Sequence, residues 1–309
     1  MNPDLPFRPV RRNVFPAPIP YIFTEKDLPA NQKLLVFLPH SDDGRYFGCS
    51  LNLTNKTNDI LIVIISPGYR GVDAAVEREE KIRMRWEEAL NWAGTLGFKK
   101  EQLVNFRADR TYSGQKVHRE DQKRLCALFE REKPTAVFMP HISDTAQAIN
   151  YNTRRIVLKA ALRTLRDLAG KNRKAGPLLL FEYPTNHVPL LPPSDKNFMV
   201  FFSDPQTVQI KHKSNLAHQS QSEACFDIQG KFAEAMMAIS EADTLHQASK
   251  RRHLSECLSG VEVNPHTSRG EHFGVTKITV DREKRLLVET RILFPLSGED
   301  KRLWTGLRG

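Results

Sequence analysis

The sequence predicts an α/β fold: a Rossmann-like three-layer sandwich in which a mostly parallel sheet lies between two layers of helices. Short apolar runs that suit buried strands alternate along the chain with segments of helical periodicity. The 309 residues are 40% hydrophobic and 27% charged, as in an ordinary globular protein. No stretch of about 18 residues is apolar throughout, so we expect no membrane span.

The strands are predicted from short runs rich in β-branched and aromatic residues. Residues 34–39 and 59–66 are apolar over most of their length, which is typical of parallel strands buried on both faces. Weaker runs of the same kind follow at 103–107, 136–140, 178–183 and 198–202. Together these runs predict the central sheet.

The helices are predicted from apolar residues at helical spacing. Residues 77–97 carry acidic residues near the start and Gly97 at the end, as a capped amphipathic helix does. Similar patterns predict helices at 120–132, 152–169, 205–219, 228–239 and 241–257. Near the C-terminus, residues 275–280 and 286–293 flank a charged DREKR turn and predict a β-hairpin.

We expect three parts: a proline-rich arm over residues 1–33, a single domain over 34–275, and a C-terminal hairpin with its tail over 276–309. The arm contains seven prolines and has no clear period. The four cysteines include no CxxC pair, and the first residues lack the basic start and apolar core of a signal peptide. A cytoplasmic protein is therefore expected.

Charge and motifs exclude several function classes. The net charge is +10. Eight basic residues lie in the segment from Arg154 to Lys174, and together they form either a solvated helix face or an anion-binding surface. This stretch lacks the interleaved aromatic residues of a nucleic-acid platform, so we expect no nucleic-acid partner. The absence of GxGxxG, GxxxxGK[ST] and a serine nucleophile elbow disfavours dinucleotide-dependent, P-loop and serine-hydrolase chemistry.

A histidine and two aspartates follow the first predicted strand directly, in the segment PHSDD at 39–43. Loops at the carboxyl ends of strands hold the ligands of such sheets. An imidazole and one carboxylate can bind a divalent metal ion while the second carboxylate activates a bound water. This chemistry suits His40, Asp42 and Asp43. The alternative is that Ser41 or Asp42 caps a following helix and His40 is an ordinary loop residue.

A second polar loop follows the strand predicted at 136–140 and carries His141 and Asp144. Strands far apart in sequence can be neighbours in a parallel sheet. His141 or Asp144 could therefore converge with His40 and Asp43 on one cleft, where a metal or acid–base site is predicted.

Several segments in a fixed order form a wider pattern. They are PHSDD at 39–43, RWEE at 85–88 followed by LG at 96–97, PTAVFMPHISD at 134–144, FEYPTNHVP at 181–189, Lys211 with HQSQ at 218–221, and EHF at 271–273. In this order they resemble the (P/A)HPDDE, RxxE…LG and K…HxSQ elements of the PIG-L/LmbE-like family of zinc-dependent N-deacetylases.

The resemblance implies roles for individual residues. His40 and Asp43 would bind zinc or another divalent metal, and Asp42 would be the general base. The protein would be a hydrolase that removes the acetyl group of a small-molecule substrate, an N-acetylated sugar or a related conjugate. Arg85 would either contact an anionic or polyol part of the substrate or form a surface ion pair with Glu88. Apart from the resemblance, the basic stretch that begins at Arg154, beside the altered motif, predicts a negatively charged ligand at the pocket rim.

The chain departs from the family pattern at the HxDH motif, whose histidines supply the third zinc ligand and the catalytic acid. No histidine stands between His141 and His187. One placement puts Asn150, Asn152 and Thr153 on the motif, and another puts Gln147 and Asn150 on its two histidines. Amide and hydroxyl oxygens are poor zinc ligands beside imidazole. The glutamate that usually follows the two aspartates is also replaced, by Gly44.

Three explanations are open. The site is rebuilt, with Asp144, Asn150, His141 or His187 as the third ligand; or it holds metal weakly and catalyses an altered hydrolysis; or it has lost its metal. The first two predict a metal-dependent amide hydrolase. The third predicts a catalytically inactive binding or assembly module of the same fold.

Overall fold

The computed structural model describes most of the residues between 30 and 221 and three further strand segments. The described ranges are 21–23, 30–66, 68–69, 72, 75–113, 117–140, 148–170, 178–183, 198–202, 205–221, 270–280 and 286–290. The helices expected at 228–239 and 241–257 lie outside them. Within the described ranges, every helix is too short or too polar to cross a membrane.

The described strands form one sheet of nine strands in the order β1-β7-β8-β6-β5-β2-β3-β4, with β9 paired to β8. Their bounds are β1 (Tyr21–Phe23), β2 (Lys33–Leu38), β3 (Asp59–Ile64), β4 (Leu103–Asn105), β5 (Ala136–Pro140), β6 (Leu178–Tyr183), β7 (Phe198–Phe202), β8 (Gly270–Val280) and β9 (Leu286–Thr290). The six internal runs predicted from β-branched composition are all strands.

The sheet has a parallel body and an antiparallel extension. The five strands β6-β5-β2-β3-β4 are parallel, and Val36 in the central strand β2 is in register with Ile62 on one side and Phe138 on the other. β8 runs antiparallel to both β6 and β7, and β9 pairs antiparallel with β8 as the predicted hairpin requires. The predicted mostly parallel α/β fold is confirmed. β8 itself crosses the boundary expected between residues 275 and 276.

Helices cover both faces of this sheet. They are α1 (Gly48–Asn55), α2 (Arg78–Thr95), α3 (Asp109–Ser113), α4 (Arg119–Glu132), α5 (Ala148–Gly170) and α6 (Pro205–Asn215), with the short 3-10 turns η2 (Asp43–Tyr46), η3 (Lys100–Gln102) and η4 (Gln219–Gln221). The sequence predicts α2, α4, α5 and α6 but neither α1 nor α3. Gly97 ends α2 as expected, with a φ of 87° that favours glycine.

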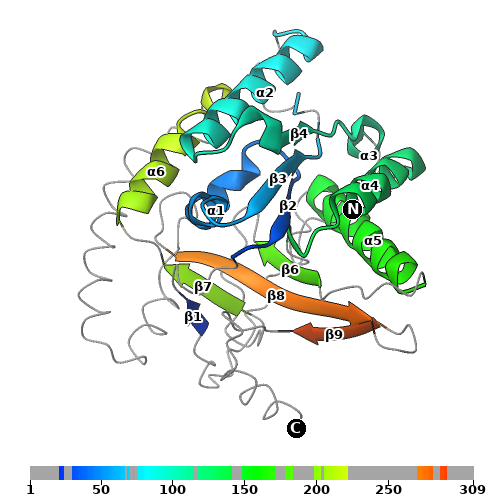
Figure 1. Ribbon diagram of the computed structural model, residues 1–309. Coiled ribbons are helices and arrows are strands. Elements are labelled where there is room, and N and C mark those ends of the chain that lie inside the picture. The colour runs from blue at the N-terminus through cyan, green and yellow to red at the C-terminus, as the bar shows by residue number, and fades with distance from the viewer. Residues whose placement is uncertain are drawn as a thin grey trace, which may run out of the picture.

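The alternation of side chains along β2 divides the interior into two apolar layers. Leu34, Val36 and Leu38 pack with α1, α2 and α6, whereas Leu35 and Phe37 pack with α3, α4 and α5. Figure 1 shows the two groups of helices on opposite sides of the sheet. Since both faces are covered, β2 is buried along its length, and the loop that follows it starts from a fixed point.

Backbone hydrogen bonds continue past the end of β2 and position the PHSDD loop. The amides of Ile65 and Ser66 donate to the carbonyls of Leu38 and Pro39 at 2.8 and 3.0 Å. The Tyr183 hydroxyl of β6 donates to the Phe37 carbonyl. The backbone that leads into His40 is therefore hydrogen-bonded to the neighbouring strands.

Gly44 has a steric role in the same loop. A Cβ atom at this position would lie 2.1 Å from the Trp92 ring of α2, and Trp92 is fully buried. The indole thus fills the space that a side chain at position 44 would need.

We expect Gly44→Ala to destabilise the protein by about 1–3 kcal/mol, because the indole has no room to retreat in a close-packed core. Chemical denaturation of the variant and the wild type measures the difference. Gly94→Ala is the matched control, since nothing lies within 4 Å of a Cβ there. It should be neutral or stabilising by up to about 1 kcal/mol. Equal stability of Gly44→Ala and wild type would contradict the packing argument.

Candidate active site at the carboxyl end of the central strand

His40 and Asp43 face each other across one turn of the loop after β2. The His40 amide donates to Asp43 Oδ2 at 2.8 Å, and His40 Nδ1 lies 3.2 Å from the same oxygen. Burial lowers the pKa of His40, but the hydrogen bond and the charge of Asp43 outweigh it, so the pKa is raised overall. The imidazole and the carboxylate are thus held together on one turn.

Asp42 is part of a buried ion-pair cluster and not a helix cap. Its side chain makes no capping hydrogen bond to η2. Instead, Arg85 Nη2 donates to Asp42 Oδ1 at 2.6 Å, and Arg45 Nη1 lies 3.4 Å from Oδ2. Burial raises the pKa of Asp42, but the two guanidinium groups lower it further, and it lies well below its usual range. Asp42 is therefore ionised at neutral pH.

Arg85 links this loop to a second carboxylate on its own helix. The Arg85 side chain is only 3% exposed, and its Nη1 lies 3.7 Å from Glu88 Oε2. Glu88 in turn accepts from Ser220 of η4, from the amide at 2.5 Å and from the hydroxyl at 2.8 Å. The expected Arg85–Glu88 ion pair is present, but it is buried and continuous with Asp42 and does not lie on the helix surface.

The HQSQ segment packs beneath the loop. His218 is buried, and its ring centroid lies 6.2 Å from that of Trp92. Burial lowers the pKa of His218 to about 3, so the imidazole is neutral near pH 7. The buried Lys211 of α6 donates to the Tyr46 carbonyl at the end of η2, at 3.3 Å. This segment supports the turn that carries Asp43.

The remaining candidates lie elsewhere or outside the described residues. Arg154 of α5 pairs with Glu182 near the carboxyl end of β6, at 2.8 Å. Asn150 is in the first turn of α5, and its side chain is outside the described part. His141, Asp144 and His187 also lie outside the described residues.

The residues present fit part of a zinc site. Imidazole nitrogen and carboxylate oxygen are ordinary zinc ligands, and His40 and Asp43 lie close enough to share one ion. Among the described residues, no group of three histidine, cysteine or acidic side chains is arranged to hold a metal. A tetrahedral site thus needs a further ligand from beyond these residues.

Sequence reasoning missed Arg45 and the full role of Glu88. Arg45 is three residues from Asp42, a spacing that brings side chains together in a helical turn, but nothing in the local pattern marks that turn as buried. Glu88 is three residues from Arg85, and only the tertiary contact with Ser220 shows that it joins two segments 132 residues apart.

Part of the chain matches a known family profile. Residues 35–161 match the profile of a family described as PIG-L: GlcNAc-PI de-N-acetylase. No curated protein matches the chain. The matched range contains the PHSDD loop, η2 and the whole of α2, which together provide the ion-pair cluster.

Two solved structures show the same fold. The N,N′-diacetylchitobiose deacetylase of Pyrococcus horikoshii is 19% identical with a TM-score of 0.53, over 79% of this chain and 83% of that chain. The 4-carboxy-2-hydroxymuconate hydratase GalB of Pseudomonas putida KT2440 is 17% identical with a TM-score of 0.54, over 80% and 95% of the two chains. The two enzymes are named for different reactions, so these likenesses establish the fold alone.

Removing the Arg85 cation should destabilise the protein strongly. Arg85→Met keeps the length of the buried stem but leaves Asp42 and Glu88 without their shared partner, which costs about 3–5 kcal/mol for a buried pair. Denaturant unfolding measures this loss. Arg83→Met on the same helix is the control, because the ion pairs of Arg83 are exposed and its loss should leave the unfolding midpoint nearly unchanged. Equal effects of the two substitutions would contradict a buried cluster.

The pKa of His218 predicts a loss of stability in mild acid. The unfolded chain takes up a proton below the ordinary histidine pKa of 6.5, but folded His218 does so only near pH 3. The contribution of His218 to stability should therefore fall by about 2 kcal/mol between pH 7 and pH 5, whereas His40, whose pKa is raised, contributes in the opposite direction. In His218→Gln this part of the pH dependence should disappear. An unchanged slope of unfolding free energy against pH would show that His218 is not buried as described.

Proposed function

Because residues 35–161 match the profile of the PIG-L family, we propose that the protein is a hydrolase that removes a short acyl group from an N-acylated amino sugar or a related conjugate. The single observation that carries the proposal is the contact of His40 with Asp43, beside the ionised Asp42, at the carboxyl end of a central parallel strand. This is where α/β sheets bind ligands.

In this proposal His40 and Asp43 hold a zinc ion or another divalent metal. The third ligand comes from Asp144, His141, His187 or Asn150. When bound, the metal makes a water molecule more acidic and polarises the amide carbonyl.

Asp42 is the proposed base that accepts a proton from the attacking water. Its carboxylate is ionised and anchored by Arg85 and Arg45, so it keeps one orientation without needing to reorganise. The same arginines weaken it as a base, because proton transfer is most efficient when the pKa of the base lies near the working pH. We therefore expect slow turnover.

Arg85 and Arg154 are the proposed substrate contacts. Arg85 Nε and Nη1 have no hydrogen-bond partner among the described residues, so these donors can bind a hydroxyl or carbonyl of the substrate. Arg154 lies on the helix that follows β5 and pairs with Glu182 at the same edge of the sheet, which suits a contact at the rim.

A binding or assembly module is the alternative function, and one observation favours it. Asn152 and Thr153, which one alignment places on the missing motif, are buried. Their side-chain polar atoms have no hydrogen-bond partner in the part of the chain that the structure describes. Neutral amide and hydroxyl groups bind polar ligands well and zinc poorly.

Acetate release and metal content distinguish the two functions. We expect the purified protein to release acetate from N-acetylglucosamine conjugates when supplied with zinc, and a chelator to stop the reaction. His40→Ala and Asp43→Ala should each lower the rate at least 100-fold and reduce bound zinc, since each removes a metal ligand.

His118→Ala is the control for these variants. His118 begins α4, where its ring accepts from the Glu120 amide, so the variant should keep both zinc and activity. A protein that binds no divalent ion and releases no acetate would exclude the hydrolase and leave the binding module.

A further inference from the structure

The imidazole of His40 contacts an aromatic ring as well as the carboxylate of Asp43. The ring centroid of Tyr112, in α3, lies 6.1 Å from that of His40, and the two ring planes are nearly perpendicular, at 80°. Aromatic rings favour edge-to-face contacts at centroid distances of about 4.5–7 Å. Because His40 Nδ1 also lies 3.2 Å from Asp43 Oδ2, the imidazole is held by a carboxylate and by a ring.

The backbone of Tyr112 is fixed to the part of the sheet that carries His40. Tyr112 is buried, and its amide donates to the Ala108 carbonyl at 2.8 Å. The Ala108 amide donates in turn to the carbonyl of Ile65, the residue after β3, at 2.8 Å. β3 pairs with β2 along its length, and His40 follows β2 by two residues. Both rings are therefore anchored to neighbouring strands.

A third ring, from the segment after β3, packs against Tyr112. The ring centroids of Tyr69 and Tyr112 are 5.3 Å apart, and their planes meet at 86°. The guanidinium of Arg78, the first residue of α2, lies 4.5 Å from the centroid of the Tyr69 ring. A cation over an aromatic face at this distance is attracted to the ring. A continuous series of contacts thus runs from α2 through Tyr69 and Tyr112 to His40.

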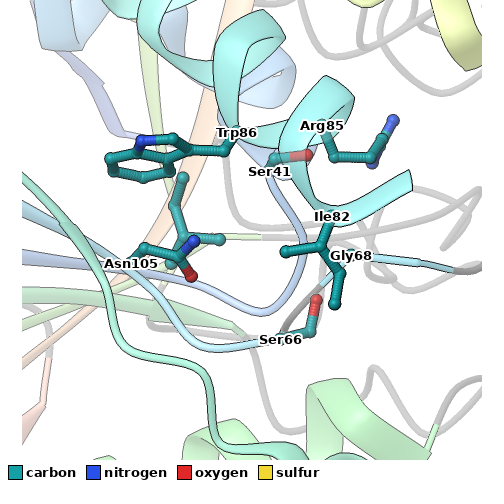
Figure 2. Close-up of a pocket in the computed structure, with 8 residues that line it drawn as sticks. Ser41, Ser66, Gly68, Ile82, Arg85, Trp86 and Asn105 are labelled. Carbon is teal, nitrogen blue, oxygen red and sulfur yellow. The ribbon is translucent and has the colours of Figure 1, made fainter. Parts of the chain in front are cut away.

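Gly68 allows the chain before Tyr69 to pass close to α2. Its φ of 78° lies in the left-handed region that favours glycine. A Cβ atom at this position would lie 3.3 Å from the Cβ atom of Arg85. Gly68 lines a narrow space together with Arg85 and Ile82, and Figure 2 shows it beside Ile82 of α2. This close approach brings Tyr69 to the helix that carries Arg78.

The orientation of the His40 ring decides how it can act together with Asp43. The terminal torsion of a histidine side chain is broad and roughly two-fold, so the ring has more than one accessible orientation. Only some of these orientations direct Nδ1 towards Asp43. Packing of the perpendicular Tyr112 ring against the imidazole limits rotation about this bond. Neighbours that orient a metal-binding histidine raise the affinity of its site for the metal.

We propose that Tyr112 is a positioning residue for His40, and that Tyr69 and Arg78 brace it. Tyr112 keeps Nδ1 of His40 turned towards Asp43, so the nitrogen and the carboxylate oxygen stay close enough to share one ion. The ring of Tyr112 makes the contact with His40, so a phenylalanine can replace it. The role of His40 as a metal ligand rests on the proposed function, whereas the restriction of its ring rests on these contacts alone.

NMR relaxation of the histidine Cε1–H groups, in the full-length protein with metal removed by a chelator, tests the restriction of the ring. The His40 signal is identified by its loss in His40→Ala. In the wild type and in Tyr112→Phe we expect a rigid ring, with an order parameter of about 0.85, and in Tyr112→Leu a value below about 0.6. Tyr69→Leu removes the brace alone and should give an intermediate value.

Zinc affinity links this restriction to the candidate site. Competition with a chromophoric chelator measures the zinc dissociation constant without any turnover. Tyr112→Leu should weaken zinc binding at least about tenfold, and Tyr112→Phe should match the wild type. Phe129→Leu is the matched control, because Phe129 is a buried aromatic residue of the same core layer and stacks on Phe37. This control should lose stability but keep the zinc affinity and the rigid His40 ring.

The outcomes separate this inference from the proposed function. A His40 ring that loosens in Tyr112→Leu and stays rigid in Phe129→Leu supports the positioning role even in a protein that binds no zinc. A ring as rigid in Tyr112→Leu as in the wild type, or equally loose in both leucine variants, would overturn it. Where Tyr112→Leu does not fold, an unchanged ring in Tyr69→Leu would overturn it as well. Zinc-dependent acetate release alongside any of these results would leave the proposed function intact.

Discussion

The buried ion pair of Asp42 with Arg85 is the contact on which the candidate site depends. This pair joins the loop after the central strand β2 to helix α2. Arg85 Nη2 lies 2.6 Å from Asp42 Oδ1, and both side chains are buried. Glu88 and Ser220 extend the connection from α2 to η4, while Arg45 closes the other side of Asp42. Each charge in this cluster is tolerable in the interior only because its partner is in place. These ion pairs therefore hold the loop in one conformation, which also fixes the positions of His40 and Asp43.

This constraint shapes the chemistry that the site can perform. The arginines keep Asp42 ionised and oriented, at the expense of its strength as a base. Within the described residues, Nε and Nη1 of Arg85 make no hydrogen bond, and Nη1 lies 3.7 Å from Glu88 Oε2. The proposed hydrolase and the alternative binding module would both depend on these residues.

Local sequence patterns predicted the body of the fold because each central strand is apolar and each long helix has one apolar face. They could not predict α1, which is buried at every position from Gly48 to Thr54 and so has no amphipathic period. Nor could they place β8 between β6 and β7, because antiparallel pairing across about 90 residues leaves no local signal. His40, Asp42 and Asp43 stood out because reactive residue types cluster after a strand. Arg45 did not, since its importance comes from burial and from the packing of Gly44 on Trp92.

A double-mutant cycle on Asp42 and Arg85 tests the account most directly. The unfolding free energies of wild type, Asp42→Asn, Arg85→Met and the double variant give the coupling between the two side chains, free of their separate effects. A buried pair that organises the site should show a coupling of at least about 2 kcal/mol, with the double variant more stable than the sum of the single losses predicts. Additive losses, within about 0.5 kcal/mol, would contradict the claim that this ion pair holds the loop in place.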